Sequence, residues 1–64
     1  MEDTRITARI ETLGEEIKAI QYLERRYRTT KRRSRADEMA HASRELRLVE
    51  IRAELEQLKK QGTT

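Results

Sequence analysis

Apolar residues recur through the first half of the chain at the spacing of an α-helix. They follow one another at intervals of three or four positions, at Ile6, Ile10, Leu13, Ile17, Ile20, Leu23 and Tyr27. At 100° per residue these positions form one stripe about 140° wide, and charged residues occupy the remaining surface. The pattern predicts an amphipathic helix over residues 4–28, with Asp3 or Thr4 as its N-cap.

The second half of the chain has two apolar stripes instead of one. The first consists of Met39, Ala42, Leu46, Val49 and Ala53, and the second, on nearly the opposite side, of Leu48, Ile51, Leu55 and Leu58. This pattern predicts a second helix over residues 35–60. Ser34 is a suitable N-cap, and Asp37 and Glu38 would complement the positive end of the helix dipole.

Residues 29–34 separate the two predicted helices and are interpreted as a basic turn. The two threonines at the start of this segment are β-branched and weaken a helix locally. The alternative is a single helix of about 55 residues in a long coiled coil, but its heptad seam would become polar for more than two heptads. We therefore expect one helical-hairpin domain over residues 1–64, with a helix stop at Gly62 and a frayed tail over residues 61–64.

Two stripes on one helix also predict self-association. A chain of 64 residues without cysteine is only marginally stable alone. The first helix can cover only one stripe, while burial of one Leu or Ile side chain contributes about 1.5–3 kcal/mol. We expect an all-α antiparallel hairpin that assembles into a dimeric four-helix bundle or a larger helical homo-oligomer. The predicted oligomer or partner interface consists of Leu48, Ile51, Leu55 and Leu58.

The positive charge of the chain is concentrated at the predicted turn. Of the eleven residues 25–35, seven are basic and none is acidic, which leaves eight basic and twelve acidic residues elsewhere. The seven cations are Arg25, Arg26, Arg28, Lys31, Arg32, Arg33 and Arg35. Because the planar guanidinium of arginine binds phosphate and stacks on bases, these residues are the candidate site for nucleic acid or another phosphate-bearing ligand. Tyr27 would add a stacking ring if it were exposed.

Little else in the sequence suggests chemistry. Cysteine is absent and His41 is the only histidine, so we expect no metal site, no cofactor and a histidine at the surface or rim of its helix. The sequence has no glycine-rich phosphate loop and no paired base and nucleophile, which argues against an enzyme. No apolar run approaches ~18 residues, and the N-terminal segment lacks the apolar core of a secretory signal, so we expect a cytoplasmic protein.

Gly14 interrupts the pattern of the first helix. A glycine inside a helix costs roughly 1 kcal/mol relative to alanine. The residue is either a tolerated weak point beside the apolar stripe or a place where a neighbouring helix approaches the backbone closely. The sequence leaves both interpretations open.

Two functions from different classes also remain open. In the first, the protein is a small regulatory hairpin that binds nucleic acid or another phosphate-bearing ligand through the basic turn. Binding would then be mostly electrostatic, because no base-reading motif is present. In the second, the protein is an interaction module, an adaptor or an inhibitor, that binds a larger protein partner through the second apolar face of the second helix. Salt-dependent binding to unrelated nucleic acids would favour the first function.

Overall fold

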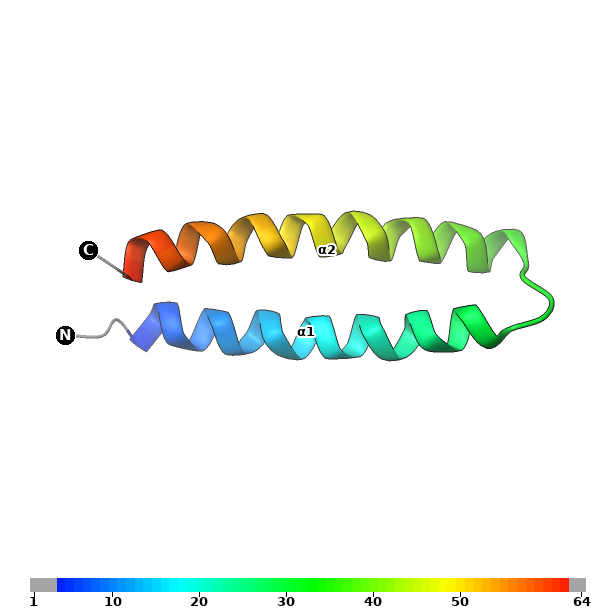
Figure 1. The fold of residues 1–64 in the computed structure, drawn as a ribbon, viewed down its shortest axis with the longest axis horizontal. Helices are drawn as coiled ribbons and strands as arrows, with labels where there is room; N and C mark the ends of the chain where they lie inside the picture. Colours follow the sequence, from blue (N-terminus) through cyan, green and yellow to red (C-terminus); the bar gives the residue numbers. More distant parts are fainter. Residues whose placement is uncertain (1–3, 63–64) are drawn as a thin grey trace.

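The computed structural model describes residues 4–62, which form two α-helices, α1 (Thr4–Thr29) and α2 (Arg35–Gly62). The helices run antiparallel and side by side, with Thr4 and Gly62 at one end of the molecule and the turn at the other (Figure 1). The molecule measures 51 × 15 × 13 Å, and its radius of gyration is 14.9 Å, against about 11 Å for a compact domain of this length. The predicted all-α helical hairpin is therefore confirmed.

The ends of the helices lie close to the expected positions. α1 continues one residue beyond the expected range, and α2 begins at the expected residue. α2 also includes Gln61 and Gly62, so the part of the expected tail that the structure describes is helical. The N-cap expected at Asp3 and the last two residues of the expected tail lie outside the described residues, whereas Thr4 is the first residue of α1.

Hydrogen bonds between Ser34 and Asp37 begin α2. The Ser34 hydroxyl accepts from the Asp37 amide at 3.1 Å, and the Asp37 carboxylate accepts from the Ser34 amide at 2.9 Å. This reciprocal arrangement is a capping box, which provides partners for two amides that the helix itself cannot satisfy. It confirms Ser34 as the N-cap, and hydrogen bonding of the Asp37 carboxylate to the backbone amide and then to the side chain of Ser34 lowers the pKa of Asp37.

Side chains at the end of α1 and in the turn donate hydrogen bonds to the last carbonyls of α1. The Thr29 hydroxyl is placed to donate to the carbonyls of Arg25 and Arg26, and the Thr30 hydroxyl donates to the Arg26 carbonyl at 2.7 Å. The Arg33 side chain donates to the carbonyl of Tyr27 at 3.2 Å. The helix therefore ends without a glycine or proline, because threonine and arginine side chains bond the carbonyl groups that its last turn leaves unpaired.

The hydrophobic core lies between the helices, from the middle of the hairpin towards the end that contains Thr4 and Gly62. Leu13 and Ile51 are fully buried and Ile20 is 6% exposed. Around them pack the partly buried side chains of Ile17, Leu48, Leu55 and Leu58. Over the part of the chain that the structure describes, no helix has the length and apolarity that crossing a membrane requires.

The structure corrects the expectation of which stripe on α2 packs against α1. The stripe expected to remain uncovered within one hairpin packs against α1 instead, and it consists of Leu48, Ile51, Leu55 and Leu58. The large apolar side chains left exposed on α2 belong to the other stripe: Met39, Leu46 and Val49, at 64%, 63% and 61% exposed. The physical reason is volume, because three leucines and an isoleucine fill the space between two helices better than a stripe that includes two alanines.

The capping box gives a first testable prediction. Replacing Ser34 with alanine should lower the free energy of unfolding by about 1 kcal/mol, because the Asp37 amide loses its partner. Urea denaturation followed by circular dichroism measures the effect. Ser43→Ala is the matched control, since Ser43 is exposed inside α2 and alanine is the better helix former there. An equal loss of stability in both variants would contradict the cap.

Candidate nucleic-acid interface

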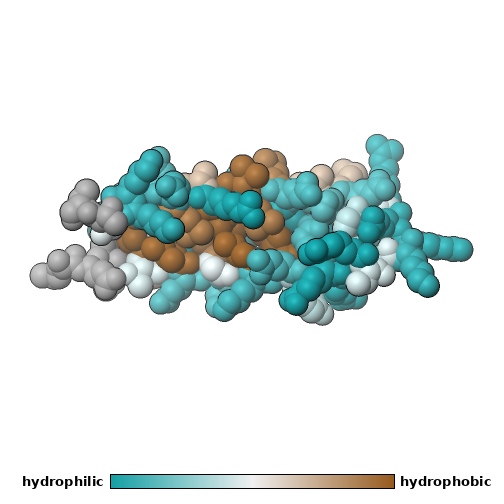
Figure 2. Space-filling view, viewed as in Figure 1, coloured by the Kyte–Doolittle hydropathy of each residue, from teal (hydrophilic) through white to brown (hydrophobic). Residues whose placement is uncertain are grey.

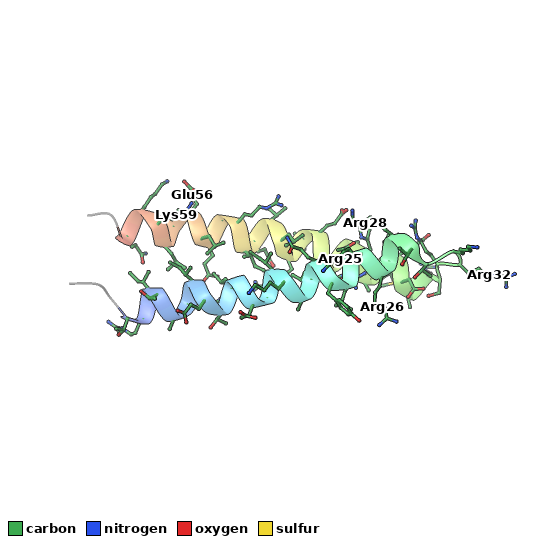
Figure 3. All side chains as sticks on the ribbon, turned by 60° about the horizontal axis from the view of Figure 1, so that its bottom comes forward. Arg25, Arg26, Arg28, Arg32, Glu56 and Lys59 are labelled. Atoms are coloured by element: carbon green, nitrogen blue, oxygen red, sulfur yellow. The ribbon has the colours of Figure 1, made fainter. Side chains whose placement is uncertain are left out.

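The seven cations predicted as a binding site surround the closed end of the hairpin. All are exposed, and they occupy the last turns of α1, the connecting turn and the first residue of α2: Arg25, Arg26, Arg28, Lys31, Arg32, Arg33 and Arg35. Arg26 and Arg28 point to different sides of α1, and Arg32 projects beyond the turn (Figure 3). The positive charge therefore covers the tip of the hairpin from several directions and does not form a stripe along one face.

The cations at the tip differ in their ion pairing from arginines elsewhere in the hairpin. Among residues 4–62, none of the seven cations forms an ion pair with an acidic side chain. Three arginines farther from the turn do have carboxylate partners, since Arg9 pairs with Glu54 at 2.5 Å, and Arg44 and Arg47 also form ion pairs. Cations at the end of α1 do complement the negative end of its helix dipole, which accounts for part of their placement.

Arg33 has a different role from the other six cations. Its Nε donates to the Tyr27 carbonyl, and its Nη2 lies 3.5 Å from the Arg28 carbonyl. Its guanidinium carbon also lies 4.3 Å from the centre of the Tyr27 ring, a cation–π contact. Arg33 thus helps to fix the turn, and fewer of its donors remain available to a ligand.

The Tyr27 ring is already engaged within the hairpin. It stacks on the His41 ring with centroids 4.3 Å apart and planes 4° from parallel, while Arg33 lies over the ring. Tyr27 is half-buried, so the condition under which we expected it to stack on a base is not met. The ring instead joins the end of α1 to the first turns of α2.

Sequence reasoning missed a polar cluster beneath the tip. Glu24 is 9% exposed, and its carboxylate accepts a hydrogen bond from Arg44 Nε at 2.9 Å and lies 2.6 Å from His41 Nδ1. The other ring nitrogen of His41 lies 2.9 Å from Glu45. Burial raises the pKa of Glu24, but the hydrogen bonds from Arg44 and His41 outweigh it, so the pKa lies below its ordinary value.

A signal for this cluster exists in the sequence. Glu24 follows Ile17 by seven residues and therefore falls on the apolar stripe of α1, where an ionised carboxylate needs partners from the facing helix. His41, expected at the surface or rim, is one of these partners and is partly buried. Across the described segment 4–62, no group of three or more His, Asp or Glu side chains is arranged to hold a metal ion.

Comparisons of the chain with protein-family models, curated protein sequences and solved structures found no match. Function is therefore argued from the residues of the site and their geometry. The main feature is the tip of the hairpin, where an ordered turn presents exposed cations that form no ion pair among residues 4–62.

Proposed function

We propose that the protein is a small, non-enzymatic regulatory protein that binds nucleic acid or another phosphate-bearing ligand through the tip of a helical hairpin. The observation that carries the proposal is the set of seven exposed cations, none of which pairs with a carboxylate among residues 4–62. Such cations attract phosphate groups and release the counterions that surround a polyanion. Binding would be weakly selective for sequence, because phosphate contacts carry no base information.

The chemistry and order of the tip support this proposal. Six of the seven cations are arginine, whose planar guanidinium can donate two parallel hydrogen bonds to one phosphate. The capping box at Ser34 and the contact of Arg33 with Tyr27 hold the backbone of the turn. A turn that is ordered before binding loses less conformational entropy when the ligand arrives.

We further propose that the hairpin acts as a homo-oligomer. It exposes 5635 Å² of surface, about 1,300 Å² more than the roughly 4,300 Å² expected of a compact protein of 7.6 kDa. A protein–protein interface of standard size buries about 800 Å² on each partner, so the excess is large enough to form one. Only three apolar side chains are buried in the described hairpin, which leaves it with a small core of its own.

A triple substitution at the tip tests the binding proposal. Arg26, Lys31 and Arg32 should be changed together to glutamine, while Arg33 is retained because it fixes the turn. Affinity for double-stranded DNA or single-stranded RNA should fall. The slope of log K against log salt should flatten by up to about 3, because three fewer counterions are released. Fluorescence anisotropy titrations of labelled oligonucleotides at several salt concentrations measure both quantities.

A matched triple variant controls for net charge. Arg5, Lys18 and Lys60 are exposed and lie away from the tip, so changing them to glutamine removes the same total charge. This variant should retain most of the affinity and nearly the parental salt slope. Equal losses in the two variants would show that total charge, and not the tip, governs binding. A parent protein without salt-dependent affinity for either polymer would refute the proposal.

A second candidate function rests on the outer side of α2. Met39, Leu46 and Val49 are each more than 60% exposed there, and an adaptor or inhibitor could use them to bind a helix of a larger protein. In that case Leu46→Gln with Val49→Gln would abolish partner binding and leave nucleic-acid affinity unchanged. A parent protein that binds no polyanion but binds one protein partner would favour this candidate.

A further inference from the structure

The two broad faces of the hairpin differ in chemistry. On one face, ion pairs bridge α1 and α2 across the core, from Arg9 to Glu54 and from Arg47 to Glu16. Hydrogen bonds from Arg47 lower the pKa of Glu16, and those from Arg9 lower the pKa of Glu54. Charged side chains thus cover the apolar core on this face.

The opposite face is apolar over the same part of the hairpin. Around the axis of α1, Ile10 and Ile17 lie about 60° and 40° from Leu13 in one direction. Arg9 and Glu16, which form the ion pairs, lie in the other direction. Leu48 and Leu55 occupy the corresponding side of α2. Figure 2 shows this face, with apolar atoms gathered over both helices and hydrophilic atoms at the tip. An open groove of about 390 Å³ lies here, lined by Ile10, Arg52, Leu55, Glu56 and Lys59.

We propose that a second copy of this chain covers this apolar face, with the two hairpins antiparallel so that their cationic tips point in opposite directions. This dimer rests on the homo-oligomer proposed above and specifies which face forms its interface and how the two hairpins are oriented. The area is sufficient for a second copy, because the excess surface of one hairpin, about 1,300 Å², exceeds the roughly 800 Å² that each partner buries in a standard interface. The face also continues the core directly, through Ile17, Leu48 and Leu55.

Charge favours the antiparallel orientation. A parallel dimer would bring two sets of seven cations together at one end, and like charges at close range repel. In the antiparallel dimer the tips are separated. The rest of each chain carries twelve acidic and eight basic residues, so it attracts the positive end of its neighbour. Glu56 and Lys59, beside the groove, lie at the end of the hairpin opposite Arg32 (Figure 3).

Gly14 marks the centre of this interface. It lies between Ile10 and Ile17 along α1, about 100° from Leu13 on the side of the apolar face. A Cβ atom added at Gly14 would meet no atom within 4 Å, so the hairpin itself does not require glycine there. A second helix that packs on this face would meet bare backbone at Gly14 and could approach closely, which is the second of the two interpretations that the sequence left open.

Mass measurement with paired variants tests the interface. Ile10→Gln with Gly14→Gln should halve the mass in sedimentation equilibrium, at concentrations where the parent is a dimer. Helicity should persist, because Ile10 is 39% exposed and glutamine is a better helix former than glycine. Leu46→Gln with Val49→Gln, on the outer side of α2, should leave the mass unchanged. A dimer that is lost only in the second variant, a dimer that survives both, or a monomeric parent would overturn the proposal.

A distance measurement tests the orientation even if the groove variant does not fold. The chain contains no cysteine, so Lys31→Cys provides a single site for a spin label in the turn. An antiparallel dimer centred near Gly14 places the two labels about 50 Å apart, at 1.5 Å per helical residue. A parallel dimer would bring them within about 25 Å and would refute the orientation. A parent protein that forms this dimer but does not bind nucleic acid would refute the proposed function, and the proposed interface would still be supported.

Discussion

Replacing Leu13 with alanine is expected to unfold most of the hairpin. Leu13 is fully buried beside Ile51, in a core with few other enclosed side chains. Truncating a buried leucine to alanine costs about 2.7–5 kcal/mol, whereas the total stability of a domain this small is about 3–10 kcal/mol. Circular dichroism at 222 nm during urea denaturation measures the loss. Protein concentration must be held fixed, because assembly makes the apparent stability depend on concentration.

Leu46→Ala is the matched control, because the same atoms are removed from a side chain that is 63% exposed. Its free energy of unfolding should stay within about 0.5 kcal/mol of the parent, as for most surface substitutions. The comparison also tests which stripe of α2 faces α1. A large loss in Leu46→Ala with a small loss in Leu13→Ala would contradict the packing of the core.

The local features of the fold are readable from the sequence because they depend on nearby residues. The spacing of Leu13, Ile17 and Ile20 is enough to predict α1 and its buried side. Ser34 and Asp37 are three residues apart, and a capping box needs only these two side chains and their own amides. The exposed cations at the tip follow in the same way from their run along the chain.

The choice of the buried stripe on α2 depends on contacts between distant residues. The stripe of Leu48 and Ile51 is flanked by Arg47, which meets Glu16 across the core. Arg9 and Glu54 form a second ion pair between the two helices. These pairs become visible only when the two helices are aligned antiparallel, and a count of apolar residues on each stripe misses them. Packing volume and charge together therefore select the face.

At the tip, too, features set by neighbouring residues can be predicted from the sequence, whereas contacts between residues far apart in the sequence cannot. The number of cations and their exposure follow from the sequence, but the special role of Arg33 does not. Its contact with Tyr27 depends on the exact path of the turn, and the stacking of Tyr27 on His41 joins residues from both helices. Glu24 could have been singled out as an acidic residue on an apolar stripe, although its partners could not be named before the helices were aligned.

Glu24→Gln is expected to destabilise the hairpin at neutral pH. Its carboxylate is mostly buried and forms hydrogen bonds with Arg44 and His41 of the facing helix. The amide that replaces it is neutral and leaves the Arg44 guanidinium without its ionic partner. Hydrogen bonds to a charged group contribute roughly 1.5–3 kcal/mol, so we expect a loss of about 2 kcal/mol at pH 7. Urea denaturation at fixed protein concentration measures it.

The acid dependence of stability distinguishes this role of Glu24 from simple packing. The pKa of Glu24 is lowered in the folded hairpin, so its contribution is fully present above the ordinary carboxyl pKa of about 4.3. That contribution is lost as the pH falls through the lower folded value, because the unfolded chain binds the proton first. Glu24→Gln should therefore be less stable at pH 7 and should lose less stability between pH 7 and pH 3 than the parent. Glu15→Gln, at an exposed site on α1, should follow the parental curve. If Glu24→Gln lost as much stability as the parent between pH 7 and pH 3, this result would contradict the claim that Arg44 and His41 stabilise the ionised form of the Glu24 carboxylate.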